Sequence, residues 1–160
     1  MKILGIDPGL TRIGFGFLDV KSKQPTVLFW GCLNFERVVA GERLGHIARE
    51  VKALIKKERP QAVAVEKLFF TKNKKTALAV SEARGVIIAA ALEAGVPVES
   101  YTPTEVKRAV GADPATGKKG VQKMVRILLN LAEEPQSDDA ADALAVALCY
   151  AYQTKVHNRG

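Results

Sequence analysis

The chain has 160 residues, of which 48% are hydrophobic, and its 24 Lys and Arg against 17 Asp and Glu give a formal charge of +7. This length suits one well-cored domain and excludes two large ones. No apolar stretch reaches the ~20 residues that cross a bilayer and no signal peptide is recognised, so we expect a cytoplasmic protein without a membrane partner. The positive charge favours a polyanionic partner but is weak evidence by itself.

The two cysteines give little functional information. Cys32 and Cys149 fall within strand-like and helix-like runs, where buried free thiols are expected. They indicate neither a disulfide framework nor a zinc site.

Strands are expected first along the chain. Apolar, β-branched and aromatic runs at 2–7, 12–20 and 26–35 are separated by Pro8-Gly9 and by a polar stretch. The periodicity of the next segment predicts a helix that ends before Pro60. A short buried strand with Glu66 at its end follows.

Helices dominate the second half of the chain. A strand is expected over VPVESY, directly after Gly95. Helices are expected at Lys74 to Ala94, from about Thr104, at Lys119 to Leu131 and at Asp138 to Gln153. Since no repeat or linker interrupts this alternation, the predicted fold class is α/β, with a mixed five-stranded sheet flanked by helices.

Two acidic residues end buried strands. Asp7 follows the first strand directly before Pro8-Gly9, and Glu66 ends the fourth. In an α/β sheet the ends of strands define a site, so these two carboxylates are candidates for it. The simpler alternatives are a turn residue for Asp7 and a solvated strand end for Glu66.

Further acids lie in the run SDDAADALAVALCYAY. Asp139 and Asp142 are three residues apart, so both lie on one face of a helix. Asp138 or Asp139 also suits the N-cap of that helix. Asp142 is harder to explain in this way because alanine and leucine surround it. A like-charged pair at this spacing is unfavourable unless it shares a cation.

Hard oxygen ligands with no His or Cys nearby favour magnesium or manganese over zinc. Two such ions about 4 Å apart would activate a water molecule and stabilise a departing oxygen in phosphodiester cleavage. Asp7, Glu66, Asp139 and Asp142 are therefore candidate ligands of such ions.

The segment EKLFFTKNKK mixes aromatic and basic residues. Phe69 and Phe70 stand among lysines, a pattern that suits stacking on an unpaired base and contact with phosphates. Alternatively, one phenylalanine belongs to the core and the lysines form a solvated face. The loop GADPATGKKG, which basic residues flank, lacks the spacing of a phosphate-binding loop.

Four motifs together resemble the Holliday-junction resolvases of the RuvC type. They are GIDPG, AVAVE followed by KLFFTKN, SEARGV and DDAADALAVAL, in this order over nearly the whole chain. The resemblance implies a single ribonuclease-H-like nuclease domain over residues 1–160 and a homodimer. It also implies magnesium-dependent, paired nicking of opposed strands at a four-way DNA junction in recombination and repair.

The resemblance also assigns the acids. Asp7 and Glu66 match the first two catalytic acids of the family, and its last two acids are separated by two residues, as Asp139 and Asp142 are. This spacing favours Asp139, with Asp138 as the alternative. Phe69 resembles a residue that contacts DNA at the junction centre. Lys107 and Lys118 match basic positions that are linked to DNA contact and catalysis in the family. The expected DNA-binding residues are Phe69, Lys72, Lys74, Lys75, Lys107, Lys118 and Lys119.

The resemblance implies further partners and cofactors. The apolar helix from Thr76 to Ala94 looks like the family's dimer element, and the branch-migration proteins RuvA and RuvB are implied partners. The expected cofactor is Mg²⁺, which Mn²⁺ would replace, with two ions at each site.

Two alternative functions are compatible with parts of the sequence. A YqgF-like RNA-processing nuclease shares a motif similar to Arg12-Ile13-Gly14, but the Glu66-Lys67-Leu68-Phe69 run and the Asp-Ala-Ala-Asp helix argue against it. A non-catalytic nucleic-acid-binding module would use the acids only as caps and turns. Cleavage assays with and without magnesium separate a nuclease from such a module.

Overall fold

The computed structural model describes residues 1–21, 24–68, 74–113, 115 and 117–157, without the side chains of 155–157. Within these ranges a five-stranded sheet has the order β3-β2-β1-β4-β5. The strands are β1 (Lys2–Asp7), β2 (Arg12–Asp19), β3 (Thr26–Asn34), β4 (Ala62–Glu66) and β5 (Val98–Tyr101). β1, β2 and β3 pair antiparallel, whereas β4 pairs parallel with β1 and β5. The predicted mixed sheet is confirmed.

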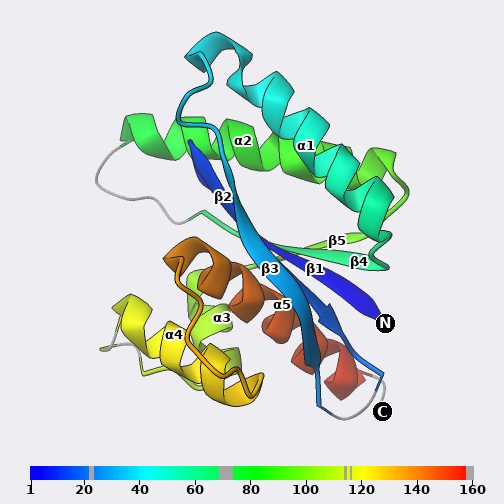
Figure 1. The fold of residues 1–160 in the computed structure, drawn as a ribbon, viewed down its shortest axis with the longest axis vertical. Helices are drawn as coiled ribbons and strands as arrows, with labels where there is room; N and C mark the ends of the chain where they lie inside the picture. Colours follow the sequence, from blue (N-terminus) through cyan, green and yellow to red (C-terminus); the bar gives the residue numbers. More distant parts are fainter. Residues whose placement is uncertain (22–23, 69–73, 114, 116, 158–160) are drawn as a thin grey trace.

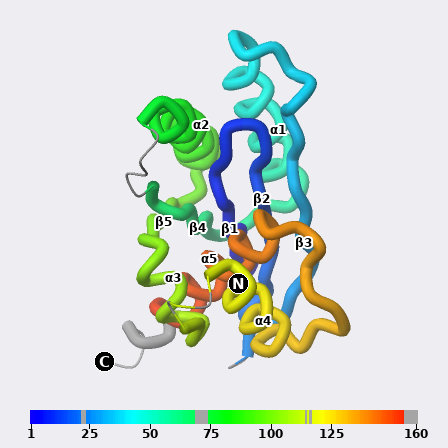
Figure 2. Tube along the Cα trace, turned by 90° about the vertical axis from the view of Figure 1, so that its left-hand side faces the viewer, coloured from blue at the N-terminus to red at the C-terminus, as the bar shows by residue number. Residues whose placement is uncertain are grey.

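Helices cover both faces of the sheet (Figure 1). The short 3-10 helix η1 (Ala40–Glu42) leads into α1 (Arg43–Glu58), which packs with α2 (Lys74–Glu93) over one face. The other face carries α3 (Pro103–Val110), α4 (Gly117–Leu128) and α5 (Asp138–His157). Figure 2 shows the two groups of helices at opposite ends of the molecule. Within the described part of the chain, none of the helices is both long and apolar enough to span a bilayer.

Alternation of side chains along the strands places Asp7 and Glu66 on the same face. Ile6 belongs to the core beneath α1 and α2, whereas Ile3 belongs to the core beneath α5, so Asp7 faces α5 as Ile3 does. Ala64 also packs on the α5 side, which puts Glu66 there. The parallel register of β1 and β4 then sets Asp7 beside Glu66.

Glycines allow α5 to lie directly against β1 and β2. A Cβ atom at Gly5 would come within 2.1 Å of the Ala143 carbonyl oxygen, and one at Gly14 within 1.9 Å of the Asp139 carbonyl oxygen. The side of α5 that faces these glycines carries small residues, namely the buried Ala140, Ala143 and Ala147. The start of α5 is therefore held against the strand ends that carry the acids.

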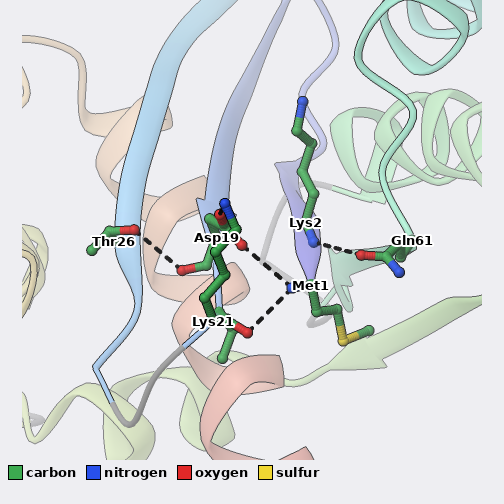
Figure 3. A network of polar contacts seen from close by, with 7 residues as sticks. Met1, Lys2, Asp19, Lys21, Thr26 and Gln61 are labelled. Carbon is green, nitrogen blue, oxygen red and sulfur yellow. Dashed lines mark hydrogen bonds and ion pairs between the residues drawn. The ribbon is translucent and has the colours of Figure 1, made fainter.

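Polar contacts fix the opposite end of β1 (Figure 3). The Met1 ammonium donates to Asp19 Oδ1 at 3.3 Å, and the Lys2 backbone N–H donates to Gln61 Oε1 at 3.0 Å. The Thr26 hydroxyl donates to the Asp19 carbonyl oxygen at 3.3 Å. Because these bonds join β1, β2, β3 and the start of β4, they fix the register that carries Asp7 to its position.

Two helix C-termini differ from the prediction by three residues or more. α4 ends at Leu128 rather than Leu131, because Asn130 adopts a left-handed conformation with φ 51° that stops the helix. α5 continues beyond Gln153 to His157, since nothing in this polar stretch breaks the helical hydrogen bonding.

The edge strand β3 is only partly covered. Leu28 and Trp30 are 44% and 38% exposed. The register with β2 turns Trp30 and Cys32 toward the α5 side. Cys149 is buried as expected, and burial raises the pKa of its thiol to about 11. Cys32 is half-buried, which corrects the expectation of a buried thiol, because an edge strand has a neighbour on one side only.

The close contact between α5 and β1 predicts that Gly5→Ala is strongly destabilising. The added methyl group would meet a helix carbonyl rather than a flexible side chain, so the free energy of unfolding should fall by about 3 kcal/mol, the upper end for overpacking. Chemical denaturation measures this loss.

Gly41→Ala is the matched control, because an added Cβ atom there meets nothing within 4 Å. Its stability should stay within about 0.5 kcal/mol of the parent protein. Equal stability of the two variants would contradict the close packing of α5.

Candidate active site

Three carboxylates from β1, β4 and α5 converge on the α5 side of the sheet. Burial, followed by the negative charges of Glu66 and Asp142, raises the pKa of Asp7 to about 9. Burial and Asp142 raise the pKa of Glu66 to about 7, although a hydrogen bond with the Asp7 side chain acts in the opposite direction. Burial likewise raises the pKa of Asp142 to about 6. These three predicted residues therefore form one electrostatic cluster.

Asp139 stands beside this cluster but is paired with Arg12. Arg12 Nε lies 3.1 Å from Asp139 Oδ2, and the Cys32 thiol lies 3.9 Å from the same oxygen. Arg12 Nη2 also donates to Ser137 Oγ at 3.4 Å. The negative charge of Asp139 still contributes to the raised pKa of Asp7, so its carboxylate is within electrostatic reach.

Asp138 points elsewhere. It is exposed, and its Oδ1 accepts a hydrogen bond from Gln122 Nε2 of α4. Its charge raises the pKa of Asp142, whereas the acids that raise the pKa of Asp7 are Glu66, Asp142 and Asp139. This geometry supports Asp139 as the fourth acid, with Asp138 as a contact between α5 and α4.

Two of the predicted basic residues face the acids. Lys107 lies half-buried on α3 and Lys118 lies exposed at the start of α4, and both lower the pKa of Glu66 and of Asp142. A capping box fixes the start of α3. In it the Glu105 backbone N–H donates to Thr102 Oγ1 at 3.2 Å, and the Thr102 backbone N–H donates to Glu105 Oε2 at 2.7 Å.

The remaining predicted DNA-binding residues lie at the surface or outside the described residues. Lys119 is exposed on α4, and Lys74 and Lys75 are exposed at the start of α2. Phe69 and Lys72 lie outside the described residues. A hollow of about 640 Å³ beside the start of α2 is lined by Lys67, Leu68, Lys74, Ala77, Leu78, Ser81 and Arg84.

Sequence reasoning missed a side chain that holds Glu66. Arg84 of α2 donates from Nε to the Glu66 backbone carbonyl oxygen at 3.0 Å and from Nη2 to Ser100 Oγ at 2.6 Å. It therefore ties the end of β4 to β5 and to the helix on the opposite face. Arg84 lies within the SEARGV motif, but its contact to a strand end cannot be inferred from periodicity.

The chemistry of the cluster suits a hard divalent cation. Its side-chain donors are carboxylate oxygens, which Mg²⁺ and Mn²⁺ prefer. Lys107 and Lys118 offset only part of the combined effect of burial and repulsion, because the pKa values of Asp7, Glu66 and Asp142 remain raised. A cation would neutralise the excess. Among the described residues, no three His, Cys, Asp or Glu side chains are already grouped as ligands of one ion.

The mixed five-stranded sheet with helices on both faces is a ribonuclease-H-like fold, and the three acids lie at the ends of two neighbouring strands and on the helix packed across them. The family model described as crossover junction endodeoxyribonuclease RuvC matches residues 3–150. The chain belongs to the RuvC family. This confirms the predicted family, fold class and enzyme class.

Relatives and solved structures agree over nearly the full length. The crossover junction endodeoxyribonuclease RuvC of Moorella thermoacetica is 49% identical over 155 residues, which cover 94% of this chain and 91% of that protein. The structure of T. thermophilus RuvC in complex with a Holliday junction substrate has a TM-score of 0.87 and 37% identity, with 98% of this chain and 96% of that chain covered. The Fowlpox virus resolvase complex shares the fold at a TM-score of 0.65 and 16% identity, covering 94% of this chain and 99% of that chain.

The raised pKa of Asp7 predicts that the metal-free protein loses stability as pH rises. The folded state holds the Asp7 proton up to about pH 9, whereas the unfolded state releases it near the ordinary aspartate pKa of 3.8, so unfolding becomes more favourable across this interval. Asp7→Asn should raise the free energy of unfolding at pH 8 by several kcal/mol, because Asn is neutral at every pH, whereas keeping Asp7 protonated above its unfolded pKa costs about 1.4 kcal/mol for each pH unit. It should also flatten the dependence on pH.

Denaturation in EDTA between pH 5 and 9 measures both effects. Asp19→Asn is the control, because neighbouring cations lower the pKa of Asp19 and its loss should not stabilise the fold. A variant Asp7→Asn that is less stable than the parent at pH 8 would contradict the clustering.

Proposed function

We propose that this protein resolves Holliday junctions by paired, magnesium-dependent nicking of opposed DNA strands. The observation that carries the proposal is the buried cluster of Asp7, Glu66 and Asp142, which faces Lys107 and Lys118 in a chain of the RuvC family. The solved T. thermophilus complex with a Holliday junction substrate supports the choice of substrate.

Each group has a role that follows from its position. Asp7, Glu66 and Asp142, joined by Asp139, would hold Mg²⁺, with two ions at each site. Bound ions would supply Lewis-acid stabilisation of the phosphoryl oxygens and would acidify a water molecule. The acids serve as ligands rather than nucleophiles, because phosphodiester cleavage of this kind needs no covalent intermediate.

The basic residues would hold the substrate. Lys107 and Lys118 lie close enough to the acids to lower their pKa values, so a phosphate held by these lysines lies next to the metal ligands. Lys74, Lys75 and Lys119 would contact more distant phosphates, together with Lys72. Phe69, three residues beyond Glu66, would stack on a base at the opened junction centre.

A homodimer would form through α2. Leu78, Gly85, Ala89 and Leu92 are all exposed and recur at a spacing that puts them on one face of the helix. Leu78 and Leu92 are 67% and 56% exposed, and an added Cβ atom at Gly85 meets nothing within 4 Å. Small residues between two leucines would let a second copy of the helix approach closely, and two copies would supply one site for each cleaved strand.

The rest of the proposal follows from the family. The nuclease would act as one domain over residues 1–160, in the cytoplasm where a bacterial chromosome lies. RuvA and RuvB would be its branch-migration partners.

Incubation with a synthetic four-way junction and Mg²⁺ tests the function. We expect symmetric nicks in the junction, little cleavage of a duplex or an RNA hairpin, and no cleavage in EDTA. Asp139→Asn should lower the cleavage rate by at least about a hundredfold, the loss typical of a disturbed metal site, while leaving junction binding intact.

Asp138→Asn is the matched control and should cut at nearly the parent rate, because Asp138 contacts Gln122 rather than Asp7. The reverse pattern would exchange the roles of the two aspartates. Cleavage of the RNA hairpin alone would favour the RNA-processing alternative, and binding without cleavage would favour a non-catalytic module.

The proposed dimer is tested with Gly85→Leu. The site is open in the single chain and leucine is the better helix former, so the fold should keep or gain stability. The bulky side chain should nevertheless separate the two helices and shift the protein toward monomer in sedimentation equilibrium. Gly45→Leu, an exposed helical position on α1, is the control and should leave the mass unchanged. An unaltered mass for Gly85→Leu would remove α2 from the interface.

A further inference from the structure

The ion pair between Arg12 and Asp139 has no role in the chemistry described so far. Arg12 Nε lies 3.1 Å from Asp139 Oδ2, and the two side chains are 46% and 27% exposed. The contact joins the first residue of β2 to the first turn of α5. A cation of the protein therefore pairs with the carboxylate that the proposed function gives to a metal ion.

The backbone holds Arg12 in this position. In the turn that follows Asp7, a Cβ atom at Gly9 would come within 2.0 Å of the Arg12 carbonyl oxygen, so the turn closes tightly on Arg12. The Thr11 carbonyl oxygen accepts a hydrogen bond from the Phe35 backbone N–H at 2.7 Å, which ties the same segment to the residue after β3. The ion pair thus connects α5 to a segment whose backbone is held in place by its own contacts.

We propose that Arg12 is a positioning residue that holds Asp139 away from the metal until DNA binds. In the free protein the guanidinium neutralises Asp139, so the divalent ion competes with Arg12 for the carboxylate. This inference rests on the proposed assignment of Asp139 as a metal ligand.

DNA would change the partner of Arg12. Nearly half of the side chain is exposed, so it is accessible to a backbone phosphate at the site. Phosphate accepts two parallel hydrogen bonds from a guanidinium, as a carboxylate does, and the strand carries a high density of negative charge. Transfer of Arg12 to a phosphate would free Asp139 for the metal, so the complete metal site would form only on the substrate.

Binding of Mn²⁺ to the DNA-free protein tests the competition, with free Mn²⁺ measured by electron paramagnetic resonance. Arg12→Gln should bind Mn²⁺ about two- to fivefold more tightly than the parent, the factor expected from losing a partly exposed ion pair. Arg49→Gln, an exposed arginine on α1 behind the opposite face of the sheet, should bind as the parent does.

A double-mutant cycle tests whether Arg12 changes the affinity for Mn²⁺ through Asp139. In an Asp139→Asn background, Arg12→Gln should no longer change the affinity for Mn²⁺. An undiminished effect there would mean that Arg12 only repels the ion through space, and unchanged affinity of the single variant would mean that it does not compete. Either result overturns the inference.

Asp7→Asn separates this inference from the proposed function. If that variant binds Mn²⁺ as tightly as the parent, the metal site itself is wrongly assigned. If it binds weakly while Arg12→Gln matches the parent, only the role of Arg12 fails.

The salt dependence of junction binding tests whether Arg12 transfers from Asp139 to a DNA phosphate. In EDTA, Arg12→Gln should reduce by about one the slope of log junction affinity against log salt concentration, as expected for the loss of one phosphate contact. Arg49→Gln should keep the parent slope. An unchanged slope for Arg12→Gln would overturn the transfer to phosphate.

Discussion

The site depends on the direct contact between the backbone of α5 and strands β1 and β2. At Gly5 and Gly14 a single methyl group would overlap a carbonyl oxygen of the helix, so the distance from helix to sheet is set by main-chain atoms. In a close-packed core, main-chain atoms shift far less than side chains do. The acids at the start of α5 consequently have a fixed distance from Asp7, although Asp142 lies 135 positions after Asp7 in the sequence.

The two faces of the sheet contribute different groups to the site. The α5 side supplies the acids and the nearby lysines, so negative and positive groups meet where burial strengthens both attraction and repulsion. The α1 and α2 side contributes a hydrogen-bond clamp, in which Arg84 reaches the backbone of Glu66 and the side chain of Ser100. Burial, together with mutual repulsion, raises the pKa values of Asp7, Glu66 and Asp142, a pattern that is common at functional sites.

The sequence predicted elements and single residues better than contacts between elements. Apolar runs ending in Asp7 and Glu66 located two strand ends correctly, and an aspartate inside an alanine-rich helix pointed to Asp142, because each signal is local. The pairing of Asp139 with Arg12 depends on which strand the helix crosses, which no local pattern records. The same limit hid the contact of Arg84, and the exposure of Cys32 followed from the place of β3 at the edge of the sheet.

The half-exposed Trp30 gives the molecule a built-in optical probe. It is the single tryptophan of the chain, and it lies on the same face of β3 as Cys32, whose thiol is 3.9 Å from Asp139. Indole emission responds to the polarity and charge of its surroundings, so the intrinsic fluorescence of the unlabelled protein reports on this side of the site. No dye, tag or substituted residue has to be introduced, and the kinetics of ion and DNA binding become accessible by stopped flow with the natural sequence.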